Sequence, residues 1–162
     1  MSAGISVPVV VRRLRSADLA LLRELNELFA AAFGSPEDYT DAPPGDTYLA
    51  ALLGKDHVVT LTAVLSGKVV GGLVAYELEK FEQARSEFYI YDLAVAADCR
   101  RQGIASLLIE HLQKIAASRG ASVIFVQADY GDDAAIGLYQ SLGIRKDVMH
   151  FDIPIVSLKD TP

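Results

Sequence analysis

The chain has 162 residues, of which 51% are hydrophobic, and it carries a net charge of −6 and a single cysteine. This length suits one domain with its own core, and no apolar run approaches the roughly 18 residues that span a bilayer. The acidic balance argues against nucleic acid as a partner, and the single cysteine excludes an intrachain disulfide. Because the N-terminus also lacks a signal-peptide pattern, we expect a protein of the reducing cytoplasm.

The first half of the chain predicts a strand, two helices and a hairpin. Apolar side chains recur at helical spacing from Leu19 to about Phe33, with Ser16 as a candidate N-cap, and Gly34 follows this helix. A turn containing Gly67 joins two runs rich in β-branched residues, as in a hairpin. The predicted strands lie at 7–13, 58–65 and 69–77, and the second, shorter helix lies at 47–53.

The second half predicts strands and helices in alternation. Leucines and an isoleucine recur at helical spacing after Ile104 and mark one face of a helix. The predicted strands lie at 87–95, 122–127 and 147–155, and the helices lie at 104–118 and 133–141. The order β-α-α-β-β-β-α-β-α-β, without repeats or an interior linker, predicts a single α/β domain over residues 1–162.

A short turn containing Gly103 lies between the strand at 87–95 and the helix that follows it. A glycine lets a ligand approach the backbone closely, because it has no Cβ. The first amides of the following helix lack intrahelical partners and lie at the positive end of its dipole. This arrangement predicts a diphosphate site, although the turn has neither the Walker pattern nor the dinucleotide pattern of glycines.

Two motifs in this half resemble signatures of the GNAT N-acetyltransferase superfamily. Arg100-x-x-Gly103-x-Ala105 resembles the acetyl-CoA pyrophosphate loop of that superfamily. The run from Ala135 to Ile144 resembles its second signature, A-x-x-L-Y-x-x-L-G followed by Phe or Ile. The resemblance implies a single GNAT-like domain with a mixed central β-sheet flanked by helices.

Three further segments are similar to a narrower group, the GNAT-type aminoglycoside 3-N-acetyltransferases, which confer gentamicin resistance. These segments are 80–87, 126–133 and 148–153. The likeness runs from about Tyr39 to Ile153.

The superfamily resemblance implies acetyl-CoA as cosubstrate. The backbone of Leu93 to Val95 would bind the pantetheine arm and polarise the acetyl carbonyl, and residues 100–106 would hold the pyrophosphate. Most superfamily members have Asn at the position of Asp132, and this departure leaves its contact to the pantetheine amide open. The implied cofactor site consists of Leu93, Ala94, Val95, Arg100, Arg101, Gln102, Gly103, Ile104, Ala105, Ser106, Asp132, Ala135, Leu138 and Tyr139.

Direct acetyl transfer needs a neutral amine, donors for the oxyanion and an acid for the departing thiolate, without a covalent enzyme intermediate. Tyr139 stands at the family's general-acid position, although a tyrosine that packs a helix against a sheet would give the same pattern. Asp92 is the candidate base, directly or through water, or else it only orients the substrate ammonium. Strict alternation would put Asp92 and Glu87 on opposite faces of their strand unless a β-bulge intervenes.

Acidic residues gather in loops of the implied site, which favours a cationic substrate such as an aminoglycoside. The three histidines are scattered without ligand spacing, so no metal site is predicted. The candidate substrate-binding residues are Asp92, Asp129, Tyr130, Asp132, Glu79, Glu37, Asp38, Asp41 and Asp152.

The narrower resemblance predicts acetyl transfer from acetyl-CoA to the 3-amino group of a 2-deoxystreptamine aminoglycoside, which would confer antibiotic resistance. Two alternatives stay open. One is a GNAT enzyme that acts on a polyamine or a protein amine, and the other is a CoA-binding sensor without catalysis. The resemblance also suggests a homodimer, with neither nucleic acid nor a membrane as partner.

Overall fold

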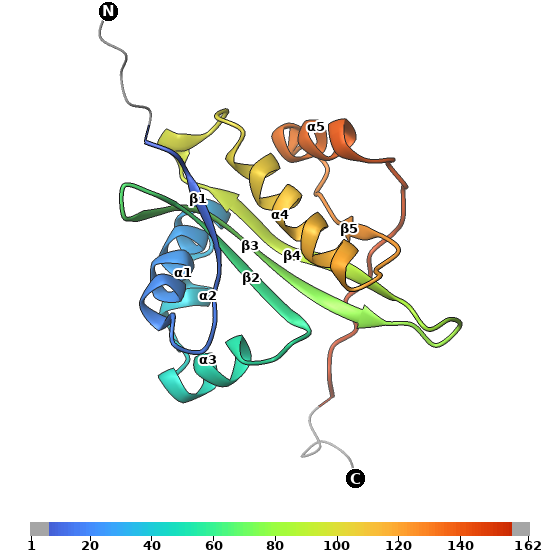
Figure 1. Cartoon of the computed structure of the whole chain (residues 1–162), viewed down its shortest axis with the longest axis horizontal. Coiled ribbons are helices and arrows are strands. Elements are labelled where there is room, and N and C mark those ends of the chain that lie inside the picture. Colours follow the sequence, from blue (N-terminus) through green and yellow to red (C-terminus); the bar gives the residue numbers. More distant parts are fainter. Residues whose placement is uncertain (1–6, 157–162) are drawn as a thin grey trace, which may run out of the picture. The chain divides into compact units, whose positions relative to one another are not determined.

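The computed structural model describes residues 7–156, and the boundary between two compact units of the chain falls after Gln127. The first unit holds a five-stranded sheet with helices on both of its faces (Figure 1). No helix in the described part combines the length and the apolar composition required to cross a membrane. The elements of the first unit are β1 (Val10–Arg13), α1 (Leu19–Phe33), α2 (Pro36–Thr40), α3 (Asp46–Leu53), β2 (Val58–Leu65), β3 (Lys68–Glu79), β4 (Ser86–Val95), a 3-10 turn (Ala97–Cys99), α4 (Ile104–Ser118) and β5 (Ile124–Val126).

The sheet is mixed, as the sequence predicts. Its strands lie in the order β1-β2-β3-β4-β5, in which the first four are antiparallel and β5 runs parallel to β4. The turn between β2 and β3 places Ser66 and Gly67 at positive φ, 51° and 80°, as tight hairpin turns require. The predicted class, an α/β fold with a mixed sheet flanked by helices, is therefore confirmed.

Side-chain alternation gives the sheet one face toward α1 and another toward α4. A Cβ on Gly72 would lie 2.1 Å from Leu25 of α1, whereas a Cβ on Gly71 would lie 3.2 Å from Ile104 of α4. Ala94 of β4 packs in the same buried cluster as Leu25, so it belongs to the α1 face. These three strand positions fix which way each neighbouring side chain of β3 and β4 points.

The N-terminal part differs from the prediction in two details. Asp18, not Ser16, occupies the N-cap position of α1, because the Ser16 hydroxyl donates to the Ala50 carbonyl of α3 at 2.9 Å. The short helix α2 was not predicted, because its five residues are too few to show a helical period.

The described residues of the second unit form one helix, α5 (Asp133–Leu142). Asp132 caps it, with Oδ1 accepting from the Ala135 amide at 3.1 Å. The strand predicted at 147–155 was wrong, since no regular structure follows α5 up to residue 156. An alternating apolar segment becomes a strand only when a neighbouring strand supplies its hydrogen bonds, and this segment has no such pairing within the described chain.

Candidate active site

A β-bulge in β4 brings two successive side chains to one face of the sheet. Val74 of β3 pairs with Asp92, but the next residue, Ala75, pairs with Ile90, so Tyr91 is an extra residue in β4. A bulge of this kind resets the alternation of side chains along the strand. Tyr91 and Asp92 therefore both lie on the α1 face.

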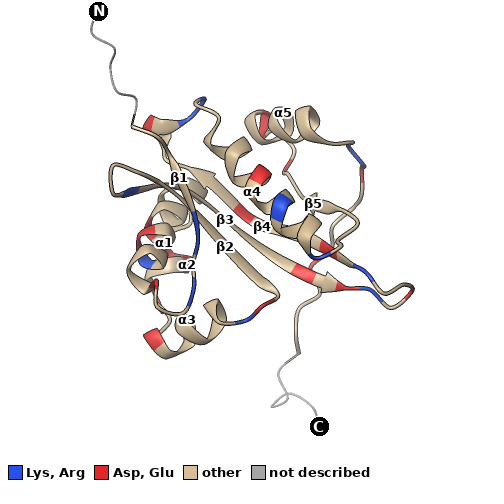
Figure 2. Ribbon diagram, viewed as in Figure 1, with Lys and Arg blue, Asp and Glu red and all other residues tan. Residues whose placement is uncertain are grey.

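The bulge also puts Glu87 on the same face as Asp92, which strict alternation would forbid. Glu87 is committed elsewhere, however, because its carboxylate lies 3.6 Å from Lys80 Nζ and 3.8 Å from a guanidinium nitrogen of Arg85. These charges mix at the tip of the β3–β4 hairpin (Figure 2). Within residues 7–156, Asp92 is thus the carboxylate of this strand that has no ion-pair partner.

Asp92 lies half-buried on the α1 face. Burial raises the pKa of its carboxyl above the ordinary value, so its carboxylate is a stronger base than that of an exposed aspartate. Burial and then the charge of Asp92 raise the pKa of the Tyr39 phenol to about 12. The pKa values of Tyr76 and Tyr89 are raised as well, chiefly by burial and in part by Asp92. Asp92 therefore lies among phenols that stay protonated at neutral pH.

Four aromatic side chains form a continuous row across β3, β4 and β5 on this face. Tyr91 lies edge-to-face against Tyr76 and Tyr89, with ring centroids 5.9 and 5.6 Å apart, and Tyr89 stacks on Phe125 at 4.8 Å. The Tyr89 hydroxyl donates to Gln127 Oε1 at 3.0 Å. We call these four rings the aromatic row.

The aromatic row is a feature that the sequence does not predict. Tyr89 and Tyr91 are two residues apart on one strand, and this spacing predicts a shared face. Tyr76 and Phe125 join them only through the register of three strands, which a single sequence does not reveal.

The second half of β4 has a free edge on the side of β5. β5 pairs with β4 at residues 88–90 only, and no other described strand pairs with Leu93–Val95 on that side. The pairing of β4 with β5 therefore ends at Ile90. Backbone groups on such an edge can bind an extended ligand in the manner of an added strand.

The turn before α4 has a backbone conformation that suits an anion. Arg101 and Gly103 both have positive φ, 60° and 78°. A Cβ on Gly103 would meet no described atom within 4 Å beyond its chain neighbours. The amides of Ile104–Ser106 precede the first α-helical hydrogen bond, which the Leu107 amide donates to the Gly103 carbonyl at 3.0 Å. Among the described residues these three amides have no backbone hydrogen-bond partner, and they lie at the positive end of the α4 dipole.

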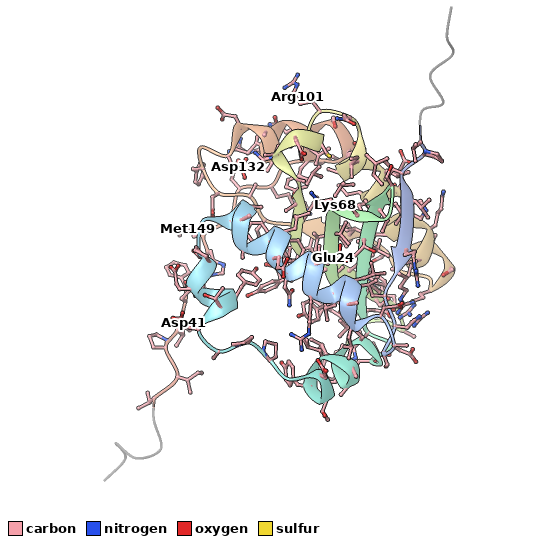
Figure 3. The ribbon with its side chains drawn as sticks, turned by 90° about the vertical axis from the view of Figure 1, so that its left-hand side faces the viewer. Glu24, Asp41, Lys68, Arg101, Asp132 and Met149 are labelled. Atoms are coloured by element: carbon pink, nitrogen blue, oxygen red, sulfur yellow. The ribbon has the colours of Figure 1, made fainter. Side chains whose placement is uncertain are left out.

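The two arginines of the turn differ in their roles. Arg100 Nε donates to the Val95 carbonyl at 3.2 Å and so ties the turn to the end of β4. Arg101 points outward from the loop (Figure 3). Gln102 is exposed as well. The predicted pyrophosphate residues form one continuous turn, and backbone amides would form the centre of the proposed pyrophosphate cradle.

Tyr139 lies half-buried on α5, in the second unit. Burial and then the charge of Asp132 raise the pKa of its phenol, so the phenol is protonated at neutral pH. Ala135 and Leu138, also predicted to contact the cofactor, are partly buried on the same helix. Asp132 uses one carboxylate oxygen as the N-cap, as noted above, and its side chain is otherwise exposed.

The acidic residues of α2 lie on the side of the sheet that carries Asp92. Asp38 and Asp92 both act on the Tyr39 phenol, whose pKa each of them raises. Glu37 lies in the first turn of the same helix, and Asp41 lies at its end (Figure 3). The structure thus brings the predicted α2 acids and Asp92 to one side of the first unit.

The other predicted acidic residues are placed differently. Glu79 pairs with Ser86, which is buried on the α4 face, so alternation puts Glu79 on the face opposite Asp92. In the second unit, Asp129 and Tyr130 are exposed before α5, and Asp152 lies 2.8 Å from His150 Nε2. The described residues include no group of three or more His, Cys, Asp or Glu side chains that could hold a metal ion.

Comparison with known proteins assigns this arrangement to a family. The model of the acetyltransferase (GNAT) family matches residues 22–144, from within α1 to just past α5. The chain belongs to the GNAT acetyltransferase family. The match includes the bulged strand, the turn before α4 and Tyr139.

Two solved structures of aminoglycoside acetyltransferases from uncultured soil metagenomic samples are similar to this chain over most of their length. The aminoglycoside acetyltransferase HMB0005 is 50% identical over 92% of this chain and 99% of its own, with a TM-score of 0.90. The aminoglycoside acetyltransferase meta-AAC0020 is 33% identical over 91% of this chain and 97% of its own, with a TM-score of 0.85. Structures of meta-AAC0020 contain trehalose or sisomicin.

Curated relatives match over shorter stretches. The ribosomal protein bS18-alanine N-acetyltransferase of Escherichia coli (strain K12) is 35% identical over 37% of this chain and 40% of its own length. The probable N-acetyltransferase camello of Xenopus laevis is 32% identical over 58% of this chain and 42% of its own. The chain therefore matches about two fifths of the length of these relatives.

GNAT enzymes use acetyl-CoA, and the residues of the first unit fit its pyrophosphate. The free amides of Ile104–Ser106 and the missing Cβ of Gly103 are what a diphosphate requires at a helix N-terminus. When bound, acetyl-CoA supplies the thioester carbonyl that an amine attacks.

Proposed function

We propose that this GNAT chain acetylates the 3-amino group of a 2-deoxystreptamine aminoglycoside and so inactivates antibiotics such as gentamicin. The observation that carries the proposal is the half-buried Asp92 carboxylate beside the aromatic row, next to the free edge of β4. A carboxylate and aromatic rings together suit a ring-shaped polycation. The similarity to two soil aminoglycoside acetyltransferases, one solved with sisomicin, supports the same class of substrate.

In this proposal Asp92 acts on the acceptor amine, which arrives as an ammonium ion. Asp92 takes one proton, directly or through a water molecule, and leaves the lone pair of the nitrogen free to attack the thioester carbonyl. The raised pKa of Asp92 makes this transfer easier than it would be for an exposed aspartate. If Asp92 only orients the ammonium, solvent accepts the proton and the dependence on Asp92 appears in substrate binding alone.

Backbone groups and Tyr139 complete the proposed reaction. The free edge at Leu93–Val95 holds the pantetheine arm, and its amides stabilise the oxyanion that develops on the thioester carbonyl. The new C–N bond forms, the C–S bond breaks, and Tyr139 gives its phenolic proton to the departing thiolate. The second proton that the nitrogen loses passes to solvent, and solvent returns a proton to the Tyr139 phenolate. The products are an acetamide and the CoA thiol, and no covalent enzyme intermediate is involved.

Two other functions remain candidates. The first is acetyl transfer to another amine. The similarity to the bS18-alanine N-acetyltransferase favours a protein amine, although it covers about two fifths of that relative, and a polyamine would suit Asp92 and the acids of α2. The second is a sensor, which would bind acetyl-CoA without turnover.

A thiol-release assay with acetyl-CoA and four acceptors, kanamycin, gentamicin, spermidine and a lysine peptide, separates these functions. We expect release with the two aminoglycosides. Release with the peptide or spermidine alone would move the function to the rival class, and no release with any acceptor would favour the sensor.

A homodimer and a cytoplasmic location also remain our predictions. Light scattering coupled to size-exclusion chromatography measures the mass of the particle in solution. Twice the mass of the chain is the expected result, and the mass of one chain would contradict it.

A further inference from the structure

Tyr91 is the most exposed ring of the three tyrosines in the aromatic row. Its relative exposure is 64%, whereas Tyr76 and Tyr89 are partly buried. Its ring is nearly perpendicular to both neighbours, with interplanar angles of 86° and 71°. Two edge-to-face contacts therefore hold the ring in place, and most of its surface is left free for a ligand.

The bulge makes Tyr91 a neighbour of Asp92 in space as well as in sequence. In a regular strand these two side chains would point to opposite faces of the sheet, but here both lie on the α1 face. A carboxylate for an ammonium group thus lies beside an aromatic ring for an apolar surface. An amino sugar presents both features, because its ammonium groups lie at the rim of a ring whose C–H bonds form an apolar face.

We propose that Tyr91 is an acceptor-binding residue, which stacks on the aminocyclitol ring or amino sugar whose ammonium group meets Asp92. This inference rests on the proposed function and adds a specificity-determining residue to it. Stacking uses the aromatic ring of Tyr91 and not its hydroxyl. The adjacent Tyr76 and Tyr89 pre-organise that ring, so that little conformational freedom is lost on binding.

The test compares Tyr91→Leu, which removes the ring, with Tyr91→Phe, which removes only the hydroxyl. Phe81→Leu is the matched control, because Phe81 is a fully exposed ring in the β3–β4 connection, outside the aromatic row. For each protein we would measure the KM for kanamycin, the KM for acetyl-CoA and the calorimetric Kd for kanamycin. Thermal unfolding of each variant checks that the fold is intact.

We expect Tyr91→Leu to raise the KM and Kd for kanamycin by about 3- to 30-fold, the range of a single aromatic contact to a cationic ligand. Tyr91→Phe and Phe81→Leu should stay within about twofold of the wild type, and the KM for acetyl-CoA should not change in any of them. Equal kanamycin constants for Tyr91→Leu and wild type would overturn the inference and leave the proposed function standing. Equal losses in the Leu and Phe variants would also overturn it, since the hydroxyl would then be the binding group. A wild type that acetylates no aminoglycoside would overturn both proposals.

Discussion

At the scale of single residues, burial raises the pKa of both groups proposed to exchange protons, with opposite consequences. For Asp92 the raised pKa means that the ionised carboxylate is destabilised, which makes it a better proton acceptor. For Tyr139 the raised pKa means that the protonated phenol is favoured, so it still carries the proton that the proposed reaction requires. Burial thus makes Asp92 a stronger proton acceptor and keeps Tyr139 protonated, the states that the proposed reaction needs.

Tyr139→Phe keeps the ring and its packing but deletes the proton donor. General acid catalysis contributes on the order of 10²–10⁴-fold, so the rate of acetyl transfer should fall within that range while acetyl-CoA affinity changes little. Single-turnover kinetics is the appropriate measurement, because slow product release cannot then hide the chemical step. A wild-type single-turnover rate would return Tyr139 to a packing role.

Asp92→Asn should lower kcat and raise the KM for the aminoglycoside, because it removes both a proton acceptor and a charge. The same change should stabilise the fold at neutral pH. A raised carboxyl pKa in the folded state means that stability is greatest when Asp92 is protonated and is lost as pH rises through that pKa.

Thermal unfolding as a function of pH checks this second effect. The melting temperature of Asp92→Asn should exceed that of the wild type at pH 7, and the difference should shrink as the pH is lowered into the ordinary range of an aspartic acid. Equal melting temperatures at pH 7 would show that the buried carboxylate does not destabilise the fold. A variant that loses substrate affinity but keeps kcat would leave Asp92 as an anchor for the ammonium and not as the base.

At the scale of elements, we expect a single substitution in the turn between β4 and α4 to abolish acetyl-CoA binding. Gly103→Val adds a β-branched side chain to a residue at φ 78°, in front of the free amides of α4. We expect acetyl-CoA binding in a calorimetric titration to be lost. The backbone strain should destabilise the fold by about 1–2 kcal/mol.

Gly120→Val is the matched control for this prediction. Gly120 also has positive φ, 71°, and an added Cβ there meets no described atom within 4 Å, but it lies at the other end of α4. The two variants should lose similar stability, and only Gly103→Val should lose acetyl-CoA affinity. Equal affinities in both would remove the assignment of the turn as the pyrophosphate cradle.

Strong periodicity explains which elements could be predicted from the sequence. The helix α4 runs from Ile104 to Ser118 as predicted, because its 15 residues are long enough to show the helical repeat of apolar side chains. The sequence does not show whether β4 has a bulge at Tyr91, because the bulge depends on the register of β4 against β3. The strand predicted at 147–155 shows the same limit, because alternation describes a segment and not the partner that it needs.

The candidate site was predictable to the same extent. The motif around Gly103 predicted a turn directly before α4, and the structure has that turn, because a helix N-terminus is a local feature of the chain. The separation of Glu79 from Asp92 and the assembly of the aromatic row were not predictable, because both follow from pairing between strands.

At the scale of the whole molecule, two features support the proposed cationic acceptor. The net charge is −6, and two similar solved structures are aminoglycoside acetyltransferases. An acidic protein attracts a polycation over a distance and repels a polyanion, which favours the antibiotic over nucleic acid.

The position of the acetyl group on the product tests this account most directly. The wild-type protein would be incubated with acetyl-CoA and gentamicin, and the product would be analysed by mass spectrometry and NMR. We predict one added acetyl group, on nitrogen 3 of the deoxystreptamine ring. Acetylation of a 6′ or 2′ amine, or an unmodified antibiotic, would contradict the account and leave only the GNAT fold.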